Sequence, residues 1–161
     1  MKTPGRVGPA ALIGIGTHVI PIDGSDSDGT TVAAVTSGTG EHIAATMAAR
    51  VSAEYMYHSG RDGTGDEHEA IQNVVNHKFM RHPAVLRSFT GASLGVMTIK
   101  KSRNSIKFYF AHNTASFALA SYTSVDRRPR TVMSRKIEGR NVAIGAKVWL
   151  YGTQPNADTT A

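Results

Sequence analysis

The chain has 161 residues, of which 40% are hydrophobic, and a formal net charge of +6. This length favours one domain with a modest core, and the apolar fraction argues against wholesale disorder. The absence of cysteine excludes disulfides, thiolate metal sites and a thiol nucleophile. The sequence has no run of about 18 apolar residues that would predict a membrane-spanning helix. It also has no recognisable signal-peptide segment. We therefore expect a cytoplasmic or nuclear protein with no membrane partner.

Two apolar segments near the start are typical of buried strands. Residues 10–16 (AALIGIG) are apolar and interrupted by glycine, and residues 30–35 (TTVAAV) are small and β-branched. The polar cluster between them, residues 23–29, indicates a surface turn.

Two helices are predicted next. Apolar residues recur every four positions, which places them on one helix face; they are Ile43, Met47, Val51 and Tyr55. The glycines of residues 60–65 end this helix. Asp66 then begins a second helix in a capping-box-like pattern with Glu69, and Pro83 stops it.

The rest of the chain has the patterns of strands. The predicted strands are residues 94–99, 106–110, 116–122 and 142–150, with a short hairpin connection around Asn113. This order predicts an α+β fold in which two helices cover a mainly antiparallel sheet. We assign residues 1–152 to one domain and residues 153–161 to a flexible C-terminal tail.

Residues 126–140 form a basic segment that we interpret as a solvated loop. It contains Arg127, Arg128, Arg130, Arg135, Lys136 and Arg140 against Asp126 and Glu138. Such a run can meet nucleic acid or an import receptor, but most charge blocks are solvated surface. It also lacks the stacking aromatics of a single-strand binder, so we do not expect a nucleic-acid partner.

Residues 37–41 (SGTGE) form the most informative segment, because glycines there join a strand to a helix start. Backbone N–H groups of a first helical turn lack partners, and Gly38 and Gly40 let a ligand approach them. The Ser37 hydroxyl adds a side-chain donor, so the segment can bind an anion or stabilise an oxyanion. The structural alternative is that Ser37 or Thr39 is simply the N-cap.

A second candidate is Arg6, which lies between Gly5 and Gly8 just before a predicted strand. Arginine in such a place suits bidentate recognition of a carboxylate. The alternative is an ordinary turn with a surface arginine.

The histidines carry no recognisable site of their own. None of the seven has the spacing of a zinc site, and no phosphate loop or dinucleotide fingerprint is present, so we expect no metal and no cofactor. His42 can orient the helix start, but we interpret it as a structural histidine whose hydrogen bonds are satisfied.

Two motifs in this order resemble the β-subunit of the asparaginase type 2 family of N-terminal-nucleophile hydrolases. They are residues 2–16 (KTPGRVGPAALIGIG) and residues 35–42 (VTSGTGEH). Within that family the chain is most similar to the threonine aspartase (taspase) branch. The segments that resemble this branch are residues 76–79 with 82–83, residues 112–114 before Tyr122, and residues 134–135 before residues 142–144.

The resemblance implies a four-layer αββα fold, of which this chain is a part, and a precursor that cuts itself to expose an N-terminal threonine. The threonine hydroxyl is then the nucleophile and its α-amine serves as base. Arg6 matches the arginine that holds a substrate carboxylate. Ser37 and Gly38 match the pair that forms the oxyanion hole, and Gly40 lines the same pocket through its backbone.

Two departures refine the expectation. Pro9 stands where asparaginases and isoaspartyl peptidases have an Asp that holds a free α-amine, which favours a peptidase that cleaves after an internal Asp. The nucleophilic threonine belongs upstream of Lys2. We therefore expect a truncated β-portion that is inactive alone and pairs with a missing α-subunit in an αβ heterodimer that assembles further and cleaves an Asp-containing protein substrate.

Two alternatives stay open. One is an asparaginase or glycosylasparaginase-like amidohydrolase with the same fold. The other is a non-catalytic basic fragment that binds nucleic acid or an import receptor, for which affinity falls steeply with salt.

Overall fold

The structure is a computed structural model, and it describes residues 8–61, 65–89, 91–124 and 126–150. The strands are β1 (Thr17–Ile20), β2 (Thr31–Gly38), β3 (Leu94–Lys101), β4 (Ser105–His112), β5 (Ser116–Ser121), β6 (Arg130–Arg135) and β7 (Ala143–Leu150). The helical segments are η1 (Pro9–Ala11), α1 (Gly40–Thr46), α2 (Ala48–His58), α3 (Glu67–Asn73), η2 (Val74–Phe79) and α4 (Pro83–Leu86).

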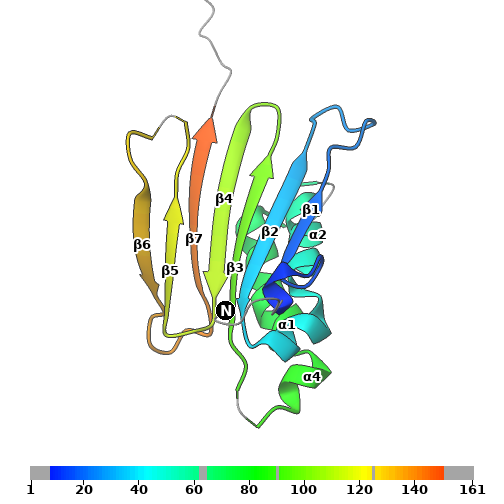
Figure 1. The fold of residues 1–161 in the computed structure, drawn as a ribbon. Helices are drawn as coiled ribbons and strands as arrows, with labels where there is room; N and C mark the ends of the chain where they lie inside the picture. The colour runs from blue at the N-terminus through cyan, green and yellow to red at the C-terminus, as the bar shows by residue number, and fades with distance from the viewer. Residues whose placement is uncertain (1–7, 62–64, 90, 125, 151–161) are drawn as a thin grey trace, which may run out of the picture.

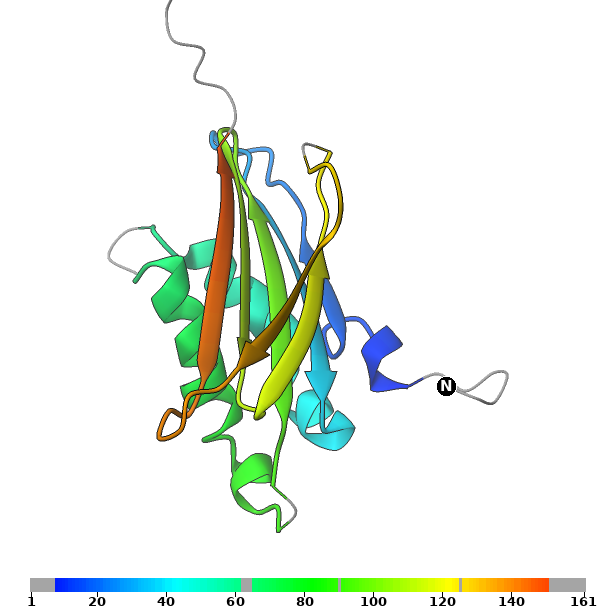
Figure 2. The same ribbon diagram turned by 90° about the vertical axis from the view of Figure 1, so that its left-hand side faces the viewer.

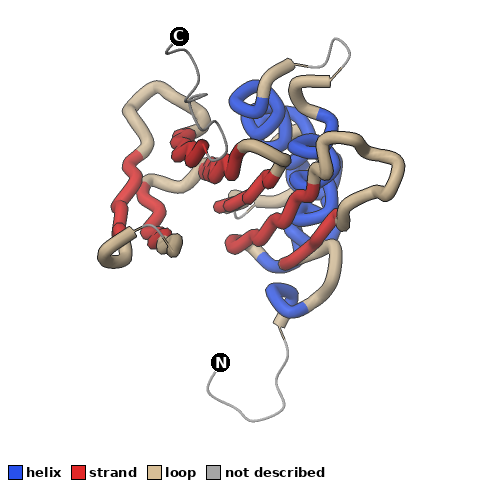
Figure 3. The backbone as a smooth tube through the Cα atoms, turned by 90° about the horizontal axis from the view of Figure 1, so that it is seen from above, coloured by secondary structure: helices blue, strands red, loops and turns tan. Residues whose placement is uncertain are grey.

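One five-stranded antiparallel sheet organises these elements (Figure 1). Its strand order is β1-β2-β3-β4-β7, and β5 and β6 form a separate antiparallel pair. Helices α2 and α3 lie on one side of the sheet, and the β5–β6 pair lies on the other side near β4 and β7 (Figures 2 and 3). The predicted α+β class with a mainly antiparallel sheet is thus confirmed. No described helix is both long and apolar enough to cross a bilayer.

The core lies between the sheet and the segments α2, α3 and η2. Small residues dominate this contact on α2, where Ala49 and Ala53 have no exposed surface. Larger side chains from α3 and η2 fill the remaining space between the helices and the sheet. The buried apolar cluster includes Val32, Ala34, Met56, Ile71, Val75, Phe79, Leu94, Val96 and Ala111. Burial of the larger of these side chains is worth about 1.5–3 kcal/mol each.

A buried ion cluster completes the helix-facing side at one end of the sheet. The Lys100 Nζ donates to the Ser59 carbonyl at 2.6 Å and lies 3.3 Å from a carboxylate oxygen of Glu67. The Lys107 Nζ lies 2.7 Å from the same oxygen. Burial alone would raise the pKa of Glu67, but the hydrogen bond from Lys107 and the charges of both lysines hold that pKa below its usual value. Burial lowers the pKa of Lys100, and the charge of Glu67 opposes that shift only in part.

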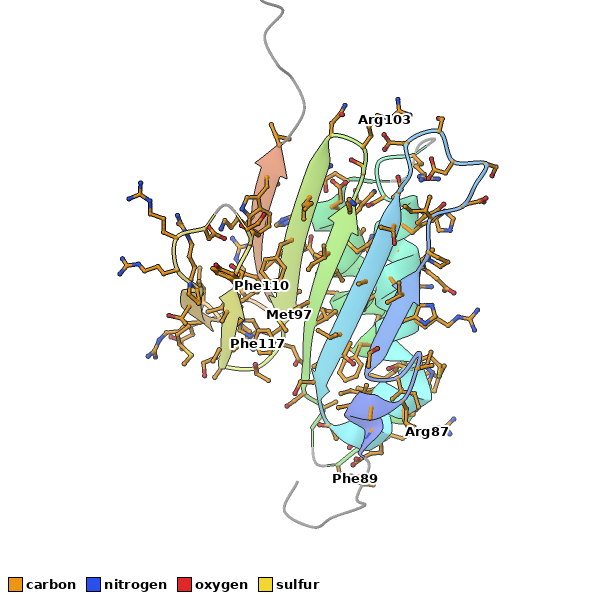
Figure 4. The ribbon with its side chains drawn as sticks, turned by 45° about the horizontal axis from the view of Figure 1, so that its top comes forward. Arg87, Phe89, Met97, Arg103, Phe110 and Phe117 are labelled. Carbon is orange, nitrogen blue, oxygen red and sulfur yellow. The ribbon has the colours of Figure 1, made fainter. Side chains whose placement is uncertain are left out.

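The opposite face of the sheet is covered only in part. Phe117 of β5 projects toward the strands that carry Met97 and Phe110 (Figure 4), and its ring lies over Gly95. A Cβ on Gly95 would overlap that ring, so a larger residue there would force the Phe117 side chain to move. Beyond β5 and β6 the face is open, with Val35 43% and Ile99 47% exposed.

The predicted strand over residues 10–16 is wrong. Pro9 begins the 3-10 helix η1, and the amides of Ile15, Gly16 and Thr17 all bond to the carbonyl of Leu12. The chain turns so tightly that a Cβ on Gly16 would overlap the backbone of Ala10. The first strand is therefore β1, which starts only at Thr17.

The first predicted helix is two helices. Met47 adopts a left-handed conformation with φ 48° and separates α1 from α2. The break is caused by contacts with the loop that precedes β1. The amides of Ala49 and Arg50 bond to the carbonyls of Ile15 and Gly14 in that loop. These loop carbonyls cap the first turn of α2, so the helix restarts there.

The second predicted helix begins as expected, because the Asp66 side chain accepts from the amide of Glu69 at 2.8 Å. After Asn73 it widens into the π-type segment η2, and the Met80 amide bonds to the carbonyl of Val75 five residues earlier. It ends before Pro83, which starts the short helix α4. The predicted number of two helices is therefore too low.

The predicted hairpin around Asn113 is also wrong. Strand β4 pairs with β7, whereas β5 pairs with β6 in the small sheet. The Asn113 side chain bonds to the amide of Leu94 and the carbonyl of Ala92, which turns the chain away from the large sheet. Because β6 covers Arg130–Arg135, the basic segment of residues 126–140 is not a loop throughout.

We expect Glu67→Gln to lower the free energy of unfolding at pH 7 by about 3–5 kcal/mol, because it leaves the Lys100 charge buried without its partner. The measurement is urea unfolding. Glu54→Gln is the matched control, since it breaks the exposed Arg50–Glu54 pair at a cost of about 0.3–0.5 kcal/mol.

The difference in the free energy of unfolding between wild type and Glu67→Gln depends on pH. The folded-state pKa of Glu67 is lowered, so its contribution is present above the unfolded value of about 4.3 and is lost as the pH falls through the folded value. The difference between wild type and Glu67→Gln therefore shrinks in acid. An equal difference at pH 7 and at about pH 3 would contradict this assignment.

Candidate functional site

The candidate site is the corner where β2 ends and α1 begins. Ser37 and Gly38 are the last residues of β2, and both are exposed. In the sheet register Ser37 pairs with Gly95, which pairs in turn with His112. These three residues form one cross-strand row on the face away from the helices. The Ser37 hydroxyl therefore lies on the open face of the sheet.

The backbone at Gly38 admits no other residue. Its φ is +149°, and a Cβ there would overlap the Ser93 carbonyl oxygen. Thr39 reinforces this contact, because its amide donates to the Ser93 carbonyl at 2.9 Å and its hydroxyl accepts from the Ser93 amide at 3.1 Å. The glycine thus has a packing role, which fixes the direction in which the corner presents its backbone.

Neither residue considered as an N-cap acts as one through its side chain. Thr39 occupies the N-cap position of α1, but its side chain makes no cap hydrogen bond. Its hydroxyl instead accepts the hydrogen bond from the Ser93 amide. Ser37 lies two residues before that position, within β2. Capping therefore does not explain the two hydroxyls.

Gly40 lies against the segment that follows Arg6 in the sequence. A Cβ on Gly40 would meet the Pro9 Cγ at 3.1 Å, so the absence of a side chain lets η1 pack on the start of α1. Thr36 adds two bonds to the same segment, because its amide donates to the Gly16 carbonyl at 2.9 Å and its hydroxyl to the Ile15 carbonyl at 2.8 Å. The two glycine-rich segments therefore meet at one corner.

Arg6, the proposed carboxylate-binding residue, lies outside the described residues, so its distance from Ser37 and Gly38 stays a prediction. The described corner brings together Ser37, Gly38, Gly40 and Pro9. In the described part of the chain, no group of three or more His, Asp or Glu side chains is arranged to hold a metal ion.

His42, which follows the corner in α1, is buried at 6% exposure. Its Nδ1 has no hydrogen-bond partner among the described residues. The prediction of a structural histidine with satisfied hydrogen bonds is therefore wrong for this ring nitrogen.

The bond between His112 and Ser134 is not predicted from the sequence. The His112 Nε2 lies 2.9 Å from the Ser134 Oγ, across 22 residues of sequence. Strand alternation alone does not reveal this pair, because it forms only when the β5–β6 pair folds over the large sheet.

No family model matches this sequence.

We expect Gly38→Ala to lower the free energy of unfolding by about 2–4 kcal/mol, because the new Cβ meets the backbone of Ser93 and φ is strained. Thermal unfolding followed by circular dichroism measures the loss. Gly24→Ala is the matched control, since a Cβ at Gly24 meets nothing within 4 Å. Equal melting temperatures for Gly38→Ala and wild type would contradict the close approach to Ser93.

Proposed function

We propose that this chain supplies the β-part of a threonine-type endopeptidase that hydrolyses the peptide bond after an Asp residue. The observation that supports it best is the packing of Pro9 against Gly40, which joins the two segments that carry the family resemblance. The threonine nucleophile comes from a segment upstream of Lys2, and the whole enzyme has the four-layer αββα fold of N-terminal-nucleophile hydrolases.

Each residue of the corner has a distinct role in the proposed reaction. The threonine hydroxyl attacks the main-chain carbonyl carbon of the Asp residue, and the threonine α-amine takes its proton. The peptide C–N bond breaks, the leaving amine takes that proton, and water then hydrolyses the acyl-threonine. The Ser37 hydroxyl and the Gly38 amide donate to the oxyanion that develops, while Gly40 lines the same pocket through its backbone. Arg6 pairs with the Asp side chain of the substrate.

Pro9 favours this substrate class over free amino acids. It offers no charge to hold a substrate α-amine, and its ring is already packed beside Gly40. An asparaginase-like reaction needs such a charge, so a free α-amine has no partner at this position.

The open face of the sheet is the surface that we assign to the upstream part of the enzyme. Val35, Ile99 and Val19 expose 43%, 47% and 58% of their surface on one side of β1, β2 and β3. Apolar sheet faces pack against a second sheet about 10 Å away, and the β5–β6 pair already occupies part of that layer. Strands from the upstream part, including the α-region, complete the layer and carry the nucleophile to Ser37.

The test uses the complete protein, in which the upstream segment and the α-region are joined to this chain. Self-cleavage into two chains is expected, followed by cleavage of an Asp-containing peptide. Ser37→Ala should lower kcat about 100- to 1000-fold, because one oxyanion donor is lost. Ser25→Ala, which changes an exposed serine in the turn before β2, is the matched control and should leave kcat unchanged.

Arg6→Ala should raise KM and lower kcat/KM for the Asp peptide, because the substrate carboxylate loses its partner. Arg127→Ala is the control for the loss of one surface charge. Cleavage by Arg6→Ala at the wild-type rate would contradict the role of Arg6. Turnover of free asparagine by the complete protein, without peptide cleavage, would favour the asparaginase-like alternative instead.

A further inference from the structure

His112 lies two strands away from Ser37, at the centre of a separate three-part hydrogen-bond arrangement. Its Nε2 lies 2.9 Å from the Ser134 Oγ, and its Nδ1 lies 3.0 Å from the Thr114 carbonyl oxygen and 3.1 Å from the Thr114 Oγ1. The Ser134 hydroxyl, the His112 imidazole and the Thr114 oxygens, which orient the ring, are thus linked in one chain of hydrogen bonds.

The surrounding bonds fix which ring nitrogen carries the proton. The Thr114 hydroxyl donates to the Ser116 carbonyl at 2.8 Å, so its oxygen faces His112 as an acceptor. The Thr114 carbonyl is an acceptor too, so the Nδ1 of His112 must donate. In the neutral ring the Nε2 then holds the lone pair and accepts the proton of Ser134.

The environment of His112 favours its neutral form. The side chain has no exposed surface, and the Phe117 ring lies beside it with centroids 5.4 Å apart. Burial lowers the pKa of His112; the Thr114 hydrogen bond opposes that shift and the charge of Lys136 adds to it. A neutral imidazole hydrogen-bonded to a hydroxyl is the arrangement of a general base with its nucleophile.

Ser134 also borders a surface pocket of about 450 Å³. Arg135, Arg140 and His68 line it, together with the amide side chains of Gln72, Asn76 and Asn141. None of its described lining residues is an Asp or Glu. The pocket therefore suits a substrate with a carboxylate group, and its amides are donors of the kind that stabilise an oxyanion.

We propose that Ser134 and His112 form a nucleophile–base pair that hydrolyses small esters bearing a carboxylate in this pocket. The Ser134 Oγ attacks the ester carbonyl carbon and its proton moves to the His112 Nε2. The bond to the alcohol oxygen breaks, and the leaving alkoxide takes the proton from Nε2. Water then attacks the acyl-serine and gives a proton to Nε2, which returns it to Ser134 as the carboxylic acid leaves.

The competing explanation is that the bond only ties β6 to β4. A purely structural tie gives Ser134 no reactivity above that of other serines in the same small sheet. Ser116 is the matched comparison, because it lies on β5, is exposed, and enters the network through its carbonyl rather than its hydroxyl.

The experiment uses the 161-residue chain and two reagents: a fluorophosphonate, which labels activated serines, and the mono-p-nitrophenyl ester of succinic acid. We expect a labelled wild-type peptide that contains Ser134, and ester hydrolysis above the buffer rate. Ser134→Ala should abolish labelling and lower hydrolysis by about 100-fold or more, whereas Ser116→Ala should retain both.

Arg140→Gln tests the substrate class without touching the pair. It should lower kcat/KM for the succinate ester by a larger factor than kcat/KM for neutral p-nitrophenyl acetate, because only the first substrate carries a carboxylate. The proposal is overturned if wild type is unlabelled, if the label maps to another residue, or if Ser134→Ala and Ser116→Ala lose activity equally. Because peptide mapping is done on wild type, the identity of the labelled serine does not depend on how a variant folds.

Discussion

The close approach of α2 to the sheet is the contact on which the rest of the structure depends. Ala49, Ser52 and Ala53 have no exposed surface, and these small residues let the helix backbone lie near β2 and β3. Larger side chains from η2, such as Phe79, then fill the space that the small residues leave at the side. With one face of the sheet closed in this way, the opposite face is left for Ser37, the β5–β6 pair and any further layer.

Much of the large sheet can be predicted because its strands carry local signals. The β-branched run at the start of β2 and the alternation in β4 both appear in the sequence, and both strands are present. The capping interaction of Asp66 can be predicted for the same reason, since it spans only three residues.

The wrong predictions lie where tertiary contacts decide the conformation. Residues 10–16 are apolar enough for a strand, but Pro9 and the close approach of Gly16 to Ala10 fold them into a turn. The break at Met47 depends on carbonyls of that turn, which helical periodicity does not report. The departure of the chain from the large sheet after β4 is accompanied in the same way by a tertiary bond, from the Leu94 amide to the Asn113 side chain.

The candidate site residues also differ in whether local sequence or tertiary structure reveals them. Sequence motifs single out Ser37, Gly38 and Gly40, because a strand end, two glycines and a helix start follow one another within a few residues. The bond between His112 and Ser134 joins two sheets, so it exists only in the folded arrangement.

The small size of the β5–β6 pair has a consequence for local opening. A two-stranded sheet is marginally stable by itself, so this one relies on the few places where it meets the large sheet. In the described part of the chain these include the Phe117 ring over Gly95 and the His112 bond to Ser134, and the ion pair of Lys147 with Asp126, 3.2 Å apart, ties the segment before β6 to β7. The amides of β5 and β6 should therefore exchange with solvent through a partial unfolding that leaves β2, β3 and β4 closed.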